Sequence, residues 1–118
     1  MGKRRVLVAD DHKMIRGFVR SMFEARGFEV SDAENGAQAV EKAQELHPDL
    51  VVLDLSMPVM NGLEAARKLK LTMPSLPLLM FTNHIGSILE HEATAAGITA
   101  VVSKAESALF FHADALLR

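Results

Sequence analysis

Residues 50–62 read Leu-Val-Val-Leu-Asp-Leu-Ser-Met-Pro-Val-Met-Asn-Gly. The apolar run at 50–53 has no polar alternation, which is typical of a strand that is buried on both faces of a parallel sheet. Asp54 ends this run, and Pro58 and Asn61-Gly62 mark a loop that leads into a helix. This stretch therefore predicts a central strand that delivers a carboxylate to one edge of a sheet.

A second apolar run, at residues 6–9, also ends in carboxylates, those of Asp10 and Asp11. The carboxyl ends of parallel strands lie at the same edge of a sheet, where ligands of such folds bind. Two buried strands that finish in carboxylates therefore predict an acidic pocket at that edge, and this is where we expect function.

Five apolar runs alternate with helical patterns along the chain. The expected strands span residues 5–9, 28–33, 50–53, 78–81 and 99–102, helices are expected between them, and a last helix is expected from about residue 106. The run at 28–33 is the most polar, as expected of an edge strand. Strands joined through helices imply right-handed crossovers and a parallel sheet. We predict an α/β three-layer sandwich with a five-stranded parallel sheet of order 2-1-3-4-5, helices on both faces, and one domain over residues 1–118.

Two helices can be assigned a buried face from the spacing of their apolar side chains. In the first, the predicted stripe is Met14, Ile15, Phe18, Val19, Met22 and Phe23, with Lys13, Arg16, Arg20 and Glu24 on the opposite face and Gly27 as the stop. In the helix after the fourth strand, the predicted stripe is Ile85, Ile88, Leu89, Ala93 and Ala96, with Gly97 as the stop.

Composition limits the class of protein. The chain has 118 residues, of which 49% are hydrophobic, so it can fill one core. A net charge of −2 argues against a nucleic-acid-binding surface, and the basic cluster at 3–5 fits the solvated start of a strand. No stretch approaches the roughly 20 apolar residues of a membrane span. The absence of cysteine excludes thiolate chemistry and is consistent with a cytoplasmic protein.

Other polar residues follow the last two strands. Thr82 follows the fourth, and Lys104 follows the fifth after Ser103. In a sheet of order 2-1-3-4-5 they join the three aspartates at one rim. Three crowded carboxylates repel one another, and Mg²⁺ is the hard cation that suits carboxylate, carbonyl and phosphate oxygens. A carboxylate beside Mg²⁺ and a lysine is suited to attack phosphorus and form an acyl phosphate.

In order and spacing, these residues resemble the receiver domain of two-component response regulators, which has the flavodoxin-like CheY fold. The resemblance covers essentially the whole chain and includes Asp10-Asp11, the segment 54–62, Thr82 and Lys104. It implies that Asp54 accepts phosphate from a histidine kinase, a phosphotransfer protein or a small acyl phosphate. It further implies a switch that changes the surface around strands four and five and the last helix, with no turnover of an external substrate.

The resemblance also implies a role for each rim residue. Asp11 would bind Mg²⁺ directly, Asp10 through water, and Ser56 through its backbone carbonyl, beside Asp54 itself. Lys104 would pair with the phosphoryl oxygen, and Thr82 would move toward it and pull the following loop along. Side chains two residues beyond the acceptor and beyond the threonine, here Ser56 and His84, would tune the lifetime of the phosphate; the alternative is that both are plain loop residues. His12 is assigned to the surface of the first helical turn, because no second histidine lies at ligand spacing.

The sequence departs from the family in the expected output region. Val101 stands where many receivers carry a tyrosine or phenylalanine that rotates on activation, so switching would rely on Thr82 and its loop. Ala105 stands where a proline often follows the lysine. Phe110 and Phe111 are adjacent and cannot both enter one core, so one is expected near the surface, as an interface for a homodimer or an output domain of the helix-turn-helix kind, or merely at the helix edge.

Four other classes of protein were weighed. A flavin or nucleotide protein of this fold needs a Gly- or Ser/Thr-rich phosphate loop after its first strand, where this chain has Asp10-Asp11. The P-loop pattern is absent. A phosphatase of the haloacid-dehalogenase kind has a second aspartate two residues after its nucleophile, where Ser56 stands here. A pseudo-receiver, which binds partners independently of phosphorylation, is the remaining alternative.

Overall fold

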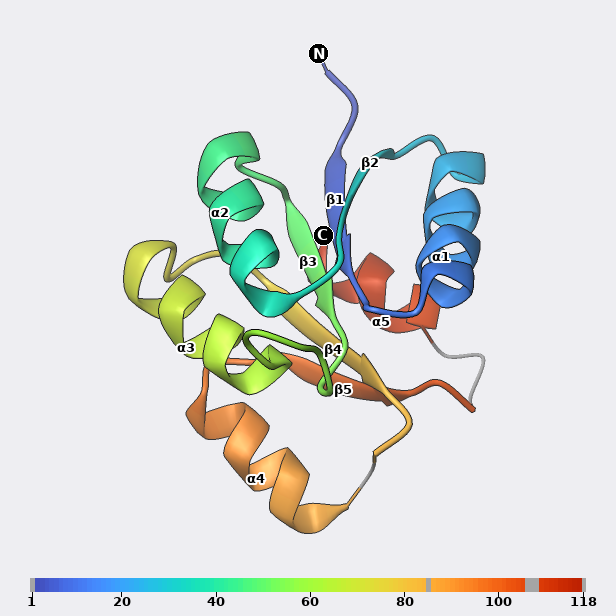
Figure 1. Cartoon of the computed structure of the whole chain (residues 1–118). Coiled ribbons are helices and arrows are strands. Elements are labelled where there is room, and N and C mark those ends of the chain that lie inside the picture. Colours follow the sequence, from blue (N-terminus) through green and yellow to red (C-terminus); the bar gives the residue numbers. More distant parts are fainter. Residues whose placement is uncertain (1, 85, 106–108, 118) are drawn as a thin grey trace.

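A computed structural model describes residues 2–84, 86–105 and 109–117. Strands and helices alternate along the chain (Figure 1). The strands are β1 (Arg5–Ala9), β2 (Glu29–Ala33), β3 (Leu50–Leu53), β4 (Leu78–Thr82) and β5 (Ala100–Ser103). The helices are α1 (Lys13–Ala25), α2 (Gly36–Leu46), α3 (Gly62–Thr72), α4 (Ser87–Ala95) and α5 (Leu109–Leu116).

The five strands form one parallel sheet in the order β2-β1-β3-β4-β5, which confirms the predicted fold class and strand order. β2 lies at an edge, as its polar composition indicated. In the central ladder, Val6 pairs with Leu50 and Ala9 with Leu53. Because β1 and β3 end in register, the residues that follow them emerge side by side at the same edge.

Two separate cores lie on the two faces of the sheet. One contains side chains of α2, α3 and α4 packed on strand residues such as Leu7, Val51 and Met80. The other contains side chains of α1 and α5 packed on neighbours in the same strands, such as Val8 and Leu79. Figure 1 shows this division, with α1 and α5 on one side of the sheet and α2, α3 and α4 on the other. The unbroken apolar runs thus correspond to strands buried on both faces.

The predicted boundaries agree with the structure to within one or two residues, as is usual at element ends. β2 begins at Glu29 rather than Phe28, and β5 spans 100–103 rather than 99–102. Gly27 and Gly97, the predicted helix stops, have φ angles of +89° and +92°. Left-handed backbone of this kind favours glycine and ends a helix. Residue 85 and residues 106–108, which the predictions placed in or beside helices, lie outside the described residues.

The predicted buried face of α1 is wrong in part. Met14 and Phe18 are 88% and 65% exposed, while Val19 and Phe23 are buried as predicted. Arg16, which the pattern placed on the solvent face, is buried. The helix is turned so that the Arg16 guanidinium reaches polar acceptors beyond the ends of β1 and β2, and apolar periodicity carries no information about such contacts.

In the predicted stripe of the helix after β4, Ala93 and Ala96 are buried and Leu89 packs against the core, whereas Ile88 is 77% exposed, so the prediction is wrong for Ile88 alone among the described members. At α5 the prediction that only one phenylalanine faces the core is confirmed: Phe111 is 76% exposed and Phe110 packs against the α1 side. Within the described part of the chain, no helix is long and apolar enough to cross a bilayer.

Candidate functional site

The ends of the central strands place two aspartates next to each other. The backbone N–H of Asp54 donates to the carbonyl of Ala9 at 2.9 Å, so the β1–β3 ladder continues to the first residue after β3. The N–H of Asp10 donates to the carbonyl of Ala33 at 3.1 Å, which extends the β1–β2 ladder in the same way. Both side chains are therefore positioned by the sheet rather than by a loose loop.

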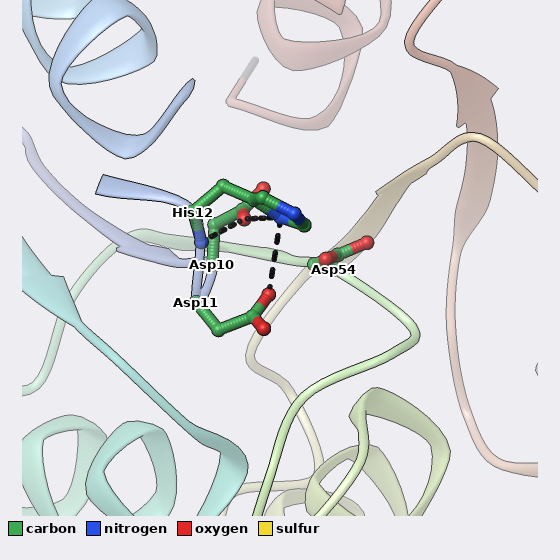
Figure 2. A group of neighbouring side chains, drawn as sticks. All are labelled: Asp10, Asp11, His12 and Asp54. Carbon is green, nitrogen blue, oxygen red and sulfur yellow. Dashed lines mark hydrogen bonds and ion pairs between the residues drawn. The ribbon is translucent and has the colours of Figure 1, made fainter. Parts of the chain in front are cut away.

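Four side chains converge at this edge, from the segment after β1 and the end of β3 (Figure 2). One ligand atom from each of Asp10, Asp11, His12 and Asp54 lies within 4.8 Å of the others. Asp10 and Asp54 are 3% and 5% exposed, whereas Asp11 and His12 are open to solvent. The group thus has a buried floor and an accessible mouth, and its carboxylate oxygens are the donor type that Mg²⁺ prefers.

Lys104 supplies the positive charge of the pocket. Its Nζ lies 2.7 Å from Oδ2 of Asp10 and 3.4 Å from Oδ1 of Asp54, and its side chain is 7% exposed. Lys104 thus contacts both carboxylates, and Asp10 is the closer partner, which sequence spacing could not distinguish. The N–H of Lys104 donates to the carbonyl of Thr82 at 2.9 Å, which brings the ends of β4 and β5 to the same rim.

The electrostatics of Asp54 reflect this crowding. Its pKa is raised above the ordinary value of 3.8, mainly because burial disfavours the charged carboxylate and further because Asp10 repels it. Lys104 and the N–H of Leu55, which donates to Oδ1 at 2.9 Å, act in the opposite direction. Any added cation would therefore relieve an existing electrostatic penalty.

Thr82 is fully buried at the end of β4. Its Oγ1 accepts a hydrogen bond from the backbone N–H of His84 at 3.1 Å, which ties the hydroxyl to the start of the loop before α4. An oxygen that accepts this bond can still donate its own proton to another acceptor. The Thr82 hydroxyl can therefore donate a hydrogen bond to a group in the pocket while it still accepts the bond from the N–H of His84.

The segment from Asp54 to α3 is held by tight backbone contacts. The N–H of Gly62 donates to the carbonyl of Leu55 at 2.8 Å, and a Cβ added at Gly62 would lie 2.2 Å from the carbonyl oxygen of Asp54. Val59 has a φ of +69°, and the N–H of Met60 bonds the carbonyl of Pro58, which makes a strained γ-turn. Glycine at position 62 thus allows the loop to close directly behind Asp54.

Two open hollows have Leu55, the residue after Asp54, in their linings. One, of about 660 Å³, is lined by Asp11, Leu55 and Ser56 among others. The other, of about 550 Å³, is lined by Leu55 and His84 together with residues of α4. Ser56 and His84 are both exposed, and of the two only Ser56 shares its hollow with a carboxylate of the site, that of Asp11.

Sequence reasoning missed the placement of two residues. His12 is 65% exposed, as expected of the surface, but its Nδ1 lies 3.4 Å from Oδ1 of Asp10 and 3.2 Å from Oδ1 of Asp11 (Figure 2). The guanidinium of Arg16 donates to the backbone carbonyl of Asp10 at 2.8 Å. The only sequence signal for either was proximity to the acidic pair.

Comparison with known proteins identifies the family. The family model described as the response regulator receiver domain matches residues 6–112. The chain belongs to this family. The receiver fold is equally evident in solved structures: a LuxR-family two-component response regulator from Aurantimonas sp. SI85-9A1 has a TM-score of 0.92 at 32% identity, over 98% of this chain and 86% of that one. The chemotaxis protein CheY4 of Vibrio cholerae has a TM-score of 0.93 at 29% identity, over 98% and 100%.

Among sequence relatives, the transcriptional regulatory protein LnrK of Bacillus subtilis is 35% identical over 106 residues, which cover 88% of this receiver and 48% of LnrK. The receiver spans about half the length of this and other curated relatives. Its predicted membership of the two-component response regulators is confirmed by these matches.

Proposed function

We propose that this receiver is a phosphorylation switch in which Asp54 accepts a phosphoryl group. The observation that carries the proposal is the buried Asp54 carboxylate beside two further aspartates and Lys104. Both recorded contacts of Asp54 use Oδ1, so we assign Oδ2 as the nucleophile. A bond forms between this oxygen and phosphorus, the bond from phosphorus to the donor breaks, and the leaving group departs with its electron pair.

The donor set fits Mg²⁺, since three carboxylates and a nearby backbone carbonyl are its ordinary protein ligands. We assign Asp11, Asp54 and the carbonyl of Ser56 as direct ligands and Asp10 as a ligand through water. When bound, the ion would neutralise the carboxylates and hold oxygens of the phosphodonor. Lys104 lies within reach of the same space and would pair with a phosphoryl oxygen in place of a carboxylate oxygen.

The response would start at Thr82. We propose that its hydroxyl donates to the new phosphoryl oxygens, and that the bond from His84 draws the loop before α4 with it. Val101 is half-buried against the core on the α4 side of the sheet, and it has no aromatic ring that could rotate on activation. The loop before α4 is therefore the part that we expect to move. The output surface would comprise the ends of β4 and β5 with α4 and α5. A further domain or a second copy of the chain would read it, and the phosphodonor would be a histidine kinase or phosphotransfer protein.

We propose that Ser56 and His84 set the lifetime of the acyl phosphate, because Ser56 lines an open hollow together with Asp11, and the backbone N–H of His84 bonds the hydroxyl of Thr82. The decay rate after removal of donor should change when either is replaced by alanine. Equal decay in both variants and the wild type would leave them as ordinary loop residues.

The proposal is tested by labelling with acetyl phosphate, followed by intact-mass and peptide mass spectrometry. We expect one Mg²⁺-dependent adduct at Asp54 that is absent from Asp54→Asn. No adduct on a folded wild-type chain would favour the alternative, a pseudo-receiver that binds partners without phosphate. Release of free phosphate at a steady, rapid rate would indicate a turnover phosphatase, which we do not expect of this site.

A further inference from the structure

Arg16 is a buried cation that has no part in the proposed transfer of phosphate to Asp54. Its side chain is 10% exposed, and its Nη1 donates to the backbone carbonyl of Asp10 at 2.8 Å. Its Nε lies 3.6 Å from Oδ2 of Asp32, and its Nη2 lies 3.8 Å from Oε1 of Glu34. One guanidinium thus joins the segment after β1 to two carboxylates at and just beyond the end of β2.

The contact with Asp10 has a specific geometric consequence. The carbonyl of Asp10 belongs to the peptide group that connects Asp10 to Asp11, and any rotation of that peptide group redirects the Asp11 carboxylate. The peptide group between Ala9 and Asp10 is fixed by the ladder bond from the N–H of Asp10 to the carbonyl of Ala33. In the peptide group between Asp10 and Asp11, the carbonyl oxygen is held by the hydrogen bond from Arg16.

A guanidinium suits this task because its donors are fixed in a plane and its charge is permanent. The ion pairs with Asp32 and Glu34 hold the guanidinium plane of Arg16 in place, and the shorter hydrogen bond holds the carbonyl of Asp10. Arg20 offers a comparison on the next turn of α1. Its Nη1 lies 3.3 Å from the same Asp32 oxygen, and its other recorded partner is Glu24. Arg20 therefore shares the β2 contact but has no recorded contact with the acidic pair.

We propose that Arg16 is a positioning residue for the metal pocket: by fixing the carbonyl of Asp10 it aims the Asp11 carboxylate at the space in front of Asp54. The inference rests on the proposed function, since it assigns Arg16 to the same pocket. It assigns no direct contact between Arg16 and the metal or the phosphoryl group.

Two effects of removing Arg16 have opposite signs, and this makes the inference testable. Loss of a nearby positive charge, taken alone, would strengthen the binding of a divalent cation. Loss of the positioning bond would weaken it, because Asp11 would sample orientations that do not bind. Weaker binding in an Arg16 variant therefore cannot be a simple charge effect.

The experiment compares Arg16→Met, Arg16→Lys and Arg20→Met with the wild type. The probe is Mn²⁺, whose free concentration is read by electron paramagnetic resonance, with Mg²⁺ followed by calorimetry. The chain has neither Trp nor Tyr, so quenching of intrinsic fluorescence is a poor readout. We expect Arg16→Met to raise the Kd about tenfold, which is about 1.4 kcal/mol. Arg16→Lys should show a smaller rise, and Arg20→Met should stay within about twofold of the wild type or bind more tightly, because it removes a positive charge but no contact with Asp10 or Asp11.

A second measurement separates positioning from general damage. The rate of labelling by acetyl phosphate is followed against Mg²⁺ concentration, beside the melting temperature of each metal-free variant. Positioning predicts that Arg16→Met needs more Mg²⁺ for half its maximal rate but approaches the wild-type plateau. A lower plateau with an unchanged Mg²⁺ requirement would overturn the inference.

The outcomes for metal binding are equally distinct. Unchanged or tighter Mn²⁺ binding in Arg16→Met would also overturn it, as would equal weakening in Arg20→Met. If Arg16→Met fails to fold, the comparison of Arg16→Lys with Arg20→Met decides by the same criteria. A wild-type chain that binds neither ion would refute the proposed function as well, whereas normal wild-type binding and labelling with an inert Arg16 would refute only this inference.

Discussion

The segments after β3 and after β4 leave neighbouring strands at the same edge of the sheet, yet they lead into helices that are attached very differently. α3 begins with a complete capping box between Asn61 and Glu64 and buries five of its eleven residues. α4 begins at Ser87 after the N-cap residue Gly86, which makes no side-chain capping bond, and it buries one of its nine residues. The Asp54 side of the site thus leads into a well-packed helix, and the Thr82 side leads into a weakly packed one.

This difference suits a switch. A reacting carboxylate has to be held in one position, whereas a surface that changes with phosphorylation needs a low free energy of local opening. Few buried contacts and an uncapped start are what lower that free energy for α4. The backbone N–H groups of Asp10 and Asp54 are likewise bonded within the sheet, whereas the recorded bond between Thr82 and the described start of its loop is the one from the N–H of His84 to the Thr82 hydroxyl.

The largest expected effect is on the free energy of unfolding, and it compares Gly62, at the start of α3, with Gly86, just before α4. Gly62→Ala would place a Cβ 2.2 Å from the carbonyl oxygen of Asp54, and backbone cannot move aside, so we expect a loss of roughly 3 kcal/mol in the free energy of unfolding. At Gly86 an added Cβ meets nothing within 4 Å, and we expect a change within about 0.5 kcal/mol. Urea unfolding followed by far-ultraviolet circular dichroism measures both. Equal stabilities would mean that the two loops are equally tolerant, and the contrast drawn between them would fail.

A smaller effect is expected at α5, which has one attached and one exposed phenylalanine. The ring centroids of Phe110 and Phe23 are 4.8 Å apart. The guanidinium carbon of Arg26 lies 3.9 Å from the ring centroid of Phe110. We expect Phe110→Ala to cost about 2 kcal/mol, because it removes a partly buried ring and these contacts. Phe111→Ala should change stability by less than about 0.5 kcal/mol.

The Phe111 variant also tests the expected interface. Thermal melts at two protein concentrations should coincide for the wild type and Phe111→Ala if the unphosphorylated chain is a monomer. A concentration-dependent melting temperature that disappears in Phe111→Ala would instead assign this exposed ring to a contact between two copies.

The smallest expected effect is a gain in stability at the acceptor itself. Because the folded-state pKa of Asp54 is raised, its charged form destabilises the metal-free fold. The penalty is absent below the ordinary aspartate pKa of 3.8, grows as pH rises from 3.8 to the raised pKa, and is complete above the raised pKa. Asp54→Asn should therefore unfold at a higher temperature than the wild type at neutral pH in the absence of metal.

The control for this prediction is pH. Melts in chelator at a pH below 3.8 should show little difference between Asp54→Asn and the wild type, while neutral melts should show the gain. A variant that is less stable than the wild type at neutral pH would mean that Lys104 outweighs burial and Asp10, contrary to the direction of the pKa shift.

Much of the molecule follows from the sequence, for reasons that are local. The unbroken run at 50–53 gives a strand buried on both faces, and parallel strands deliver Asp10 and Asp54 to the same edge. Other features depend on tertiary contacts that periodicity does not report. The burial of Arg16 and the exposure of Phe18 reflect a rotation of α1 toward polar acceptors. The closer approach of Lys104 to Asp10 than to Asp54 depends on side-chain reach across strands.

The register of β1 and β3 has a consequence for how this gene can change in length. Ala9 pairs with Leu53, and Asp54 takes the next position in the same ladder. Deleting one residue from Leu50–Leu53 would draw Asp54 into the sheet and exchange the faces of the remaining strand residues, because side chains alternate. The turn at residues 73–77, at the opposite end of the sheet, lies far from the acceptor along the strands. Insertions and deletions should therefore be found at that end, whereas the spacing between the two apolar runs and their aspartates should stay fixed.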